Sequence, residues 1–180
     1  MVRLLFIAFC ILLHTHTAHA DTKPLATEEE VPAALKAFEK WTGAFLAKDY
    51  KTQRAMTHPR IIRWYDKNRW KKLRNNSKQN GDIVSVKVEK AVSIAPEKIP
   101  CTEQGHCYRK NIPVLMFLLQ TEYTKNTPPQ PEYVVMARSD KGWLFGGGTF
   151  PNRPMGETLL IMNQKDVDKY TFRANNGFPR

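Results

Sequence analysis

The residues with the most evident chemical potential are two cysteines and a histidine within one short stretch, Cys101-Thr102-Glu103-Gln104-Gly105-His106-Cys107. Zinc needs four ligands, and beyond residue 20 only His58 adds another Cys or His side chain. The two-residue spacing of thiol oxidoreductases is also absent, which makes a redox-active pair the weaker alternative. We therefore expect a disulfide between Cys101 and Cys107, and no metal site.

A disulfide requires an oxidising compartment, and the amino terminus predicts export. Arg3 is followed by an apolar run over residues 4–13 and then by Ala18-His19-Ala20, a pattern that signal peptidase accepts. We expect cleavage near Ala20, and therefore a periplasmic or secreted protein with no transmembrane segment after processing. A retained membrane anchor is the alternative, and the shortness of the apolar run disfavours it.

Processing of this segment would leave 160 of the 180 residues and lower the formal net charge from +11 to +10, because Arg3 is the only charged residue removed. This length suits one domain. We expect a flexible amino-terminal segment over residues 21–30, a single domain over 31–150 and a carboxy-terminal extension over 151–180. The positive charge excess attracts anionic partners.

The hydrophobic pattern changes from helical to extended at Gly81. Before it, Leu35, Phe38, Trp41 and Phe45 recur at helical spacing in a helix expected over residues 32–48. A short helix within residues 49–59, stopped by proline, and a third helical stretch over 60–76 are expected to follow.

After Gly81, strands are expected at residues 84–94, 108–123, 132–139 and 143–150, with a turn over 125–131 and a tight connection at 140–142. The run 114–119 within the second stretch is apolar on both faces, which suits a central strand. The two cysteines then fall at the tip of the hairpin that joins the first two strands. This order predicts an α+β fold, with amino-terminal helices packed on a curved four-stranded antiparallel sheet.

Three segments resemble one known superfamily: WTGAFLAKDY, RWKKLRNNSKQNGDIVS and YVVMARSDKGWLFGGGTF. They look like the nuclear-transport-factor-2-like (cystatin-like) superfamily, and within it are similar to a group of small exported bacterial proteins classed as a domain of unknown function. The motif residues are Trp41, Asp49-Tyr50, Trp70, Gly81 and Gly142-Trp143, within residues 35–150. The cysteine pair and the segment 151–180 have no counterpart in that resemblance.

The resemblance implies a cone formed by the sheet and the long helix around an apolar cavity. Its members include isomerases, dehydratases, ligand-binding proteins and assembly domains, and fold alone does not choose among them. A homodimer is also left open, since members often dimerise through the sheet. The aromatic residues that would line such a cavity, and otherwise form the core, are Phe38, Trp41, Phe45, Tyr65, Phe117, Trp143 and Phe145.

An enzyme of this type needs an acid or base with a shifted pKa. The candidates are Asp49, His58, Tyr65, Asp66, Tyr108 and Tyr123. Each has a structural alternative: Asp49 as a helix cap, His58 beside a proline, and Tyr108 and Tyr123 as strand residues whose hydroxyls reach water. Since no nucleophile motif or paired carboxylates are present, we assign no catalytic residue and no cofactor, and an isomerase- or dehydratase-like enzyme stays an alternative.

The segment 60–78 concentrates positive charge against a single acid, Asp66. Its basic residues, interleaved with Trp64, Tyr65 and Trp70, are Arg60, Arg63, Lys67, Arg69, Lys71, Lys72, Arg74 and Lys78. Such a pattern either solvates a helix face or binds anionic groups. Outside the cytoplasm we expect an anionic lipid, a glycan or an acidic protein rather than nucleic acid. The sequence thus predicts an exported, non-catalytic binding domain, with a pocket-type ligand binder as the alternative.

Overall fold

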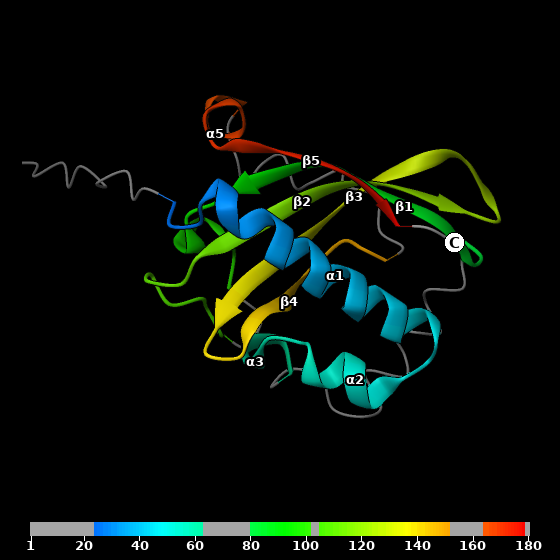
Figure 1. The fold of residues 1–180 in the computed structure, drawn as a ribbon, viewed down its shortest axis with the longest axis horizontal. Coiled ribbons are helices and arrows are strands. Elements are labelled where there is room, and N and C mark those ends of the chain that lie inside the picture. The colour runs from blue at the N-terminus through cyan, green and yellow to red at the C-terminus, as the bar shows by residue number, and fades with distance from the viewer. Residues whose placement is uncertain (1–23, 63–79, 102–104, 152–163, 179–180) are drawn as a thin grey trace, which may run out of the picture.

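The computed structural model describes residues 24–62, 80–101, 105–151 and 164–178 (Figure 1). Its elements are η1 (Glu28–Glu30), α1 (Val31–Leu46), α2 (Tyr50–Ala55), α3 (Pro59–Ile62), β1 (Ile83–Ser93), η2 (Pro96–Lys98), β2 (Val114–Tyr123), β3 (Asn126–Ser139), β4 (Gly142–Gly148), α5 (Gln164–Lys169) and β5 (Thr171–Phe178). The predicted α+β class is confirmed.

The sheet has five antiparallel strands in the order β4-β3-β2-β1-β5, and the expectation of four strands is therefore wrong. The fifth strand, β5, lies in the segment treated as an extension and pairs with β1, where Ala91 lies opposite Phe172. Its sequence, TFRANNGF, ends in residues that disfavour strands. Pairing with β1 and burial of Ala174 in the core compensate for that low propensity. The apolar stretch at residues 159–162 also suits an added strand by its sequence, but it lies outside the described residues.

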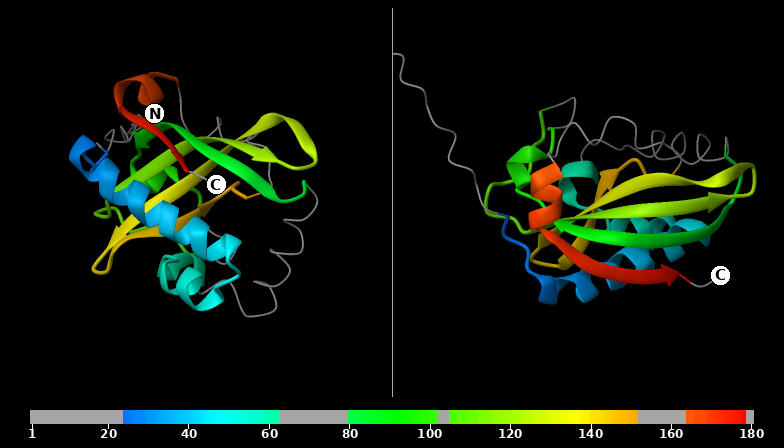
Figure 2. Two further views of the ribbon diagram at one scale, coloured as in Figure 1. Left: turned by 45° about the vertical axis from the view of Figure 1, so that its right-hand side comes forward. Right: turned by 90° about the horizontal axis from the view of Figure 1, so that it is seen from above.

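Helix α1 covers one face of the twisted sheet (Figure 2). Pro32 is in its first turn, where a proline costs no intrahelical hydrogen bond. Its apolar stripe packs inward: the Phe38 ring lies 6.0 Å from the ring of Phe117 on β2 and 5.4 Å from that of Phe150. The helix ends at Leu46, close to the expected limit. Before the helix begins, the backbone oxygen of Ala26 accepts a hydrogen bond from Ser93 Oγ on β1. This bond attaches part of the segment expected to be flexible to the sheet.

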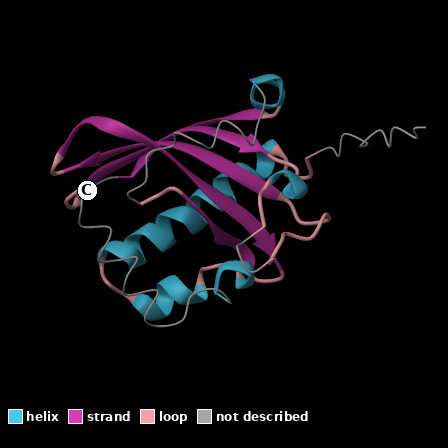
Figure 3. Ribbon diagram, turned by 180° about the vertical axis from the view of Figure 1, so that it is seen from behind, coloured by secondary structure: helices cyan, strands magenta, loops and turns pink. Residues whose placement is uncertain are grey.

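The sheet is apolar on both faces, because strand β2 is buried on both of them. Leu115 and Phe117 face α1, whereas Val114 and Met116 face the 94–113 connection and α5. Figure 3 shows the molecule from the side opposite to that of Figure 1, where α5 and loop segments lie beside one end of the strands. The prediction of a central strand buried on both sides is confirmed.

Two predictions that rest on prolines are wrong. The turn expected over residues 125–131 consists instead of Thr124 and Lys125, because residues 126–131 belong to β3. The prolines are tolerated there because β4 pairs with β3 only over residues 134–139, so they lie beyond that ladder. Pro59 begins α3 instead of stopping a helix, since the preceding residues pair with β4, where Thr57 forms a bridge to Phe145.

Candidate functional site

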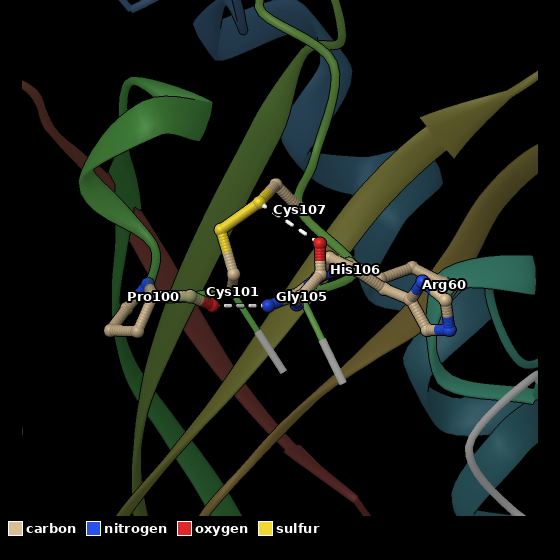
Figure 4. Close-up of a disulfide and its surroundings, with 6 residues drawn as sticks. All are labelled: Arg60, Pro100, Cys101, Gly105, His106 and Cys107. Carbon is tan, nitrogen blue, oxygen red and sulfur yellow. Dashed lines mark hydrogen bonds between the residues drawn. A yellow bond between two sulfur atoms is a disulfide. The ribbon is translucent and has the colours of Figure 1, made fainter. Parts of the chain in front are cut away.

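Cys101 and Cys107 form the predicted disulfide (Figure 4). The bond closes a ring between the paired strands β1 and β2, as expected, within the long connection over residues 94–113. Both cysteines are exposed. The ring therefore needs other contacts to hold it against the body of the molecule.

Arg60 supplies those contacts. Its Nε donates to His106 O at 2.9 Å, its Nη2 donates to Pro100 O, and its guanidinium carbon lies 4.2 Å from the centre of the Tyr108 ring. The residue is only 8% exposed. Arg60 was expected on an anion-binding surface, but its charge is directed inward and engaged by the disulfide loop.

The other seven basic residues of the 60–78 segment lie outside the described residues, as do Trp64, Tyr65, Asp66 and Trp70. The seven basic residues are Arg63, Lys67, Arg69, Lys71, Lys72, Arg74 and Lys78.

His58 and Tyr108 complete the cluster around Arg60. The backbone N–H of Arg60 donates to His58 Nδ1 at 3.2 Å, which places the imidazole proton of neutral His58 on Nε2. Burial, with the Arg60 charge as a second cause, lowers the pKa of His58 to about 4. Tyr108 Oη donates to Gly146 O at 2.8 Å, and burial raises the pKa of Tyr108 to about 12. Both side chains are neutral at pH 7 and serve to attach the loop to α3 and β4.

Two other acid–base candidates have clear environments. Asp49 caps α2, because its Oδ1 accepts a hydrogen bond from Thr52 N at 3.1 Å, so the capping interpretation is confirmed.

The expectation that the hydroxyls of Tyr108 and Tyr123 reach water is wrong. Tyr123 is 4% exposed, and its Oη donates to both carboxylate oxygens of Glu132, at 3.0 and 2.9 Å.

The aromatic residues expected around a cavity pack against one another. Trp41 stacks on Phe145, with 3.8 Å between ring centres, and lies parallel to Phe45 at 5.8 Å. Its Nε1 donates to Thr57 Oγ1 at 3.0 Å. Phe45 is half-buried, and Tyr65 lies outside the described residues. The other five residues are buried: Phe38, Trp41, Phe117, Trp143 and Phe145. The described rings thus belong to the core between α1 and the sheet.

Farther along β2, the helix-facing side of the sheet becomes polar. Side chains two residues apart share a face, so Thr121 and Tyr123 follow Phe117 toward the end of the strand. Glu132 lies opposite Leu119 on the neighbouring strand β3, diagonal to Thr121. Thr121 and Glu132 are each 0% exposed. A carboxylate and two hydroxyls are therefore buried on a face that is otherwise apolar.

Three buried side-chain oxygens of the described residues lack a hydrogen-bond partner: Oγ1 of Thr42, Oε1 of Gln53 and Oγ1 of Thr121. Thr42 lies on α1 one turn beyond Phe38, and Thr121 lies beyond Phe117 on β2. Because α1 and β2 run in the same general direction (Figure 1), both hydroxyls lie past the Phe38–Phe117 contact toward the same end of the molecule.

Thr42, Thr121, Tyr123 and Glu132 together make up what we call the polar interior set. The sequence analysis included only Tyr123 among candidate residues. The sequence does indicate that Glu132 is buried. It lies two and four residues before Val134 and Met136 in one strand, so it shares the face that they turn toward α1. The sequence analysis placed Glu132 at the start of the strand expected over residues 132–139 and gave it no role.

The part of the chain that the structure describes contains no group of three or more His, Cys, Asp or Glu side chains that could hold a metal ion. None of the described helices is long and apolar enough to cross a membrane. Comparison with protein-family models, curated proteins and solved structures gave no match. The resemblance to the nuclear-transport-factor-2-like superfamily therefore stays a prediction.

Proposed function

We propose that this protein is an exported binding domain that takes up a small molecule between α1 and the sheet, at the polar interior set. The observation that carries the proposal is the pair of buried, unpartnered hydroxyls, Thr42 Oγ1 and Thr121 Oγ1. Burying a hydroxyl without a hydrogen bond costs about 1–3 kcal/mol. A ligand that supplies the missing partners recovers this free energy on binding.

The surroundings suit such a ligand. Binding sites for small molecules are mostly apolar, with a few convergent polar groups that fix orientation. Here the polar groups come after apolar core residues along each element: Thr42 follows Phe38 on α1, and Thr121 follows Phe117 and Leu119 on β2. The apolar part of a ligand would therefore contact these core side chains, and its polar end would reach the hydrogen-bonding groups. Export rests on the amino-terminal pattern and on the Cys101–Cys107 disulfide.

Substitution of threonine by valine tests the proposal, because it removes only the hydroxyl. In the ligand-free protein, Thr121→Val and Thr42→Val should leave the free energy of unfolding unchanged or raise it, since an unpaired buried polar group is lost. Thr57→Val is the matched control: its Oγ1 accepts from Trp41 and donates to Gln53 O, so its loss should destabilise by about 1–2 kcal/mol.

Native mass spectrometry of the gently purified protein supplies the binding measurement. We expect a co-purified small molecule that is retained by Thr57→Val and lost or reduced in Thr121→Val. If Thr121→Val destabilises the ligand-free protein as much as Thr57→Val does, the hydroxyl has a structural role and the proposal is incorrect.

A second function is favoured by the charge of residues 63–78, which hold seven basic residues against one acid. We propose that this segment binds an anionic lipid, glycan or acidic protein. Retention on anionic vesicles should fall steeply with salt and be abolished by joint glutamine substitution of Arg69, Lys71, Lys72 and Arg74. Glutamine at Lys36, Lys40, Lys48 and Lys51, four exposed lysines of the α1–α2 region, is the matched control. Retention that does not change with salt would exclude this function.

A further inference from the structure

We infer that the Cys101–Cys107 disulfide is a redox switch. In the folded protein a dithiol reduces it, and the reduction releases Arg60 and α3 from the disulfide loop while both hydrophobic cores stay packed. The inference is independent of a ligand at the polar interior set. It follows from the exposure of the two cysteines and from the two carbonyl groups that Arg60 binds.

The disulfide is accessible to a thiolate from solvent. Both cysteines are exposed, and neither belongs to either of the two hydrophobic clusters. One thiolate of the dithiol attacks one cysteine sulfur and forms a mixed disulfide with it, while the other cysteine leaves as a thiolate. The second thiol of the reductant then displaces the first cysteine. The dithiol is oxidised to a disulfide, and Cys101 and Cys107 together take up two electrons and two protons.

The fold as a whole does not require this bond. Strands β1 and β2 pair with each other from Ile83↔Tyr123 to Ser93↔Leu115, so their ladder closes the long connection without the sulfurs. Closing a ring of seven residues favours the folded state by about 30- to 50-fold. Folding equilibrium constants of small domains are about 10³–10⁸. We therefore expect the reduced protein to remain folded.

The two carbonyls that hold Arg60 each come immediately before a cysteine. Nε of Arg60 donates to the oxygen of His106, and its Nη2 donates to the oxygen of Pro100 (Figure 4). The residues that follow these two, Cys107 and Cys101, are joined by the disulfide. The bond therefore keeps both acceptors within reach of a single guanidinium.

Once the ring is open, the two carbonyls move independently and Arg60 loses this pair of acceptors. The residue is only 8% exposed, and a buried cation without acceptors is far less stable than one in water. Its remaining contact, the ring of Tyr108, directly follows Cys107 in the chain and so belongs to the same loop. Reduction therefore favours a state in which the guanidinium lies in solvent and adds an exposed positive charge to the surface.

Release of Arg60 also affects α3 and its attachment to the sheet. The backbone N–H of Arg60 donates to His58 Nδ1, and the oxygen of His58 accepts from the N–H groups of Ile61 and Ile62. The N–H of His58 in turn donates to the oxygen of Phe145 on β4. The switch thus acts on residues 58–62, at the edge of the sheet formed by β4.

The pKa of His58, followed by NMR in the full mature chain, reports whether Arg60 is held. Burial, and secondly the charge of Arg60, lower this pKa to about 4 in the oxidised protein. The protein is reduced with dithiothreitol at about pH 8 without denaturant and then titrated with acid. Alkylation and mass spectrometry of a sample confirm two free thiols. We expect the pKa of His58 to rise to about 5 or above, because both causes are weakened, and the amide signals of Phe38 and Phe117 to keep their positions.

Two variants show whether Arg60 carries the effect. The double variant Cys101→Ser, Cys107→Ser should show the raised pKa of His58 without reductant and should not respond to dithiothreitol. In Arg60→Met, reduction should change the pKa of His58 by less than about 0.3, since the contact that the disulfide controls is already absent. Should Arg60→Met fail to fold, Arg60→Lys replaces it, because an ammonium cannot bind both carbonyls as the guanidinium does.

Four results would overturn the inference. The disulfide could resist dithiothreitol in the absence of denaturant, or its reduction could abolish the amide spectrum of the folded protein, which would make the bond a support of the whole fold. The pKa of His58 could stay at about 4 after reduction, which would separate the disulfide from Arg60. An equal rise of this pKa in Arg60→Met and in the wild type would show that another contact transmits the change.

Discussion

Replacing Arg60 by methionine tests whether the disulfide loop is held by a buried guanidinium. The substitution keeps much of the aliphatic volume but removes the donors to His106 O and Pro100 O and the contact with Tyr108. Each charge-assisted hydrogen bond is worth about 1.5–3 kcal/mol. Desolvation of the guanidinium offsets part of this sum. We therefore expect a net loss of about 2–4 kcal/mol, or roughly 5–15 °C in Tm for a chain of this size.

Urea unfolding followed by tryptophan fluorescence gives the free energy directly. Arg54→Met is the matched control, because Arg54 is exposed at the end of α2 and its loss should cost less than about 0.5 kcal/mol. Arg60→Lys should recover less than half of the loss, since an ammonium cannot serve two carbonyls in the fixed geometry of the guanidinium fork.

A double-mutant cycle with the disulfide makes this prediction sharper. Replacing Cys101 and Cys107 by serine should cost about 2 kcal/mol through the entropy of a seven-residue ring. If the ring holds the carbonyls that Arg60 binds, the two changes should couple by about 1 kcal/mol or more. A loss below about 0.5 kcal/mol for Arg60→Met, or strictly additive effects in the cycle, would refute the reasoning.

Two further predictions concern the same cluster. Gly146→Ala should destabilise by about 2 kcal/mol in urea unfolding, because its Cβ would lie 2.0 Å from Oη of the buried Tyr108, whereas Gly43→Ala, with open space around it on α1, should gain about 0.5–1 kcal/mol. Because burial and the Arg60 charge lower the pKa of His58 from 6.5 to about 4, the unfolded chain binds a proton more readily in that range. Stability should therefore be full above pH 6.5 and fall by at most about 3 kcal/mol toward pH 4, and His58→Asn should flatten this dependence; an equally steep loss in the variant would contradict it.

The main elements could be predicted because their patterns are local. The stripe that contains Phe38 and Trp41 fixes the buried face of α1, and the alternation in β1 fixes its two sides. The strand β5 could not be predicted, since TFRANNGF is held by its pairing with β1, a contact that no local pattern contains. The start of β3 was missed for a similar reason: its prolines are acceptable only because β4 ends before reaching them.

The site could be predicted less well than the fold. The disulfide followed from the count and spacing of the cysteines, which requires no knowledge of the fold. Arg60 looked like the first residue of a basic surface, because sequence does not reveal that two loop carbonyls converge on it. Glu132 was given no role, although it lies two residues before Val134 in the same strand and therefore shares its buried face.

Two sets of buried polar side chains differ in whether their hydrogen bonds are satisfied, and this difference supports the proposed ligand site. Around the disulfide loop, Arg60, His58 and Tyr108 each have a hydrogen-bond partner, although a guanidinium is much harder to bury than a hydroxyl. On the helix-facing side, Thr42 and Thr121 are left without one. A chain that accommodates a buried arginine could as easily carry valine at a threonine position, at no cost in volume. The two unpartnered hydroxyls therefore support our proposal of a ligand that completes their hydrogen bonds.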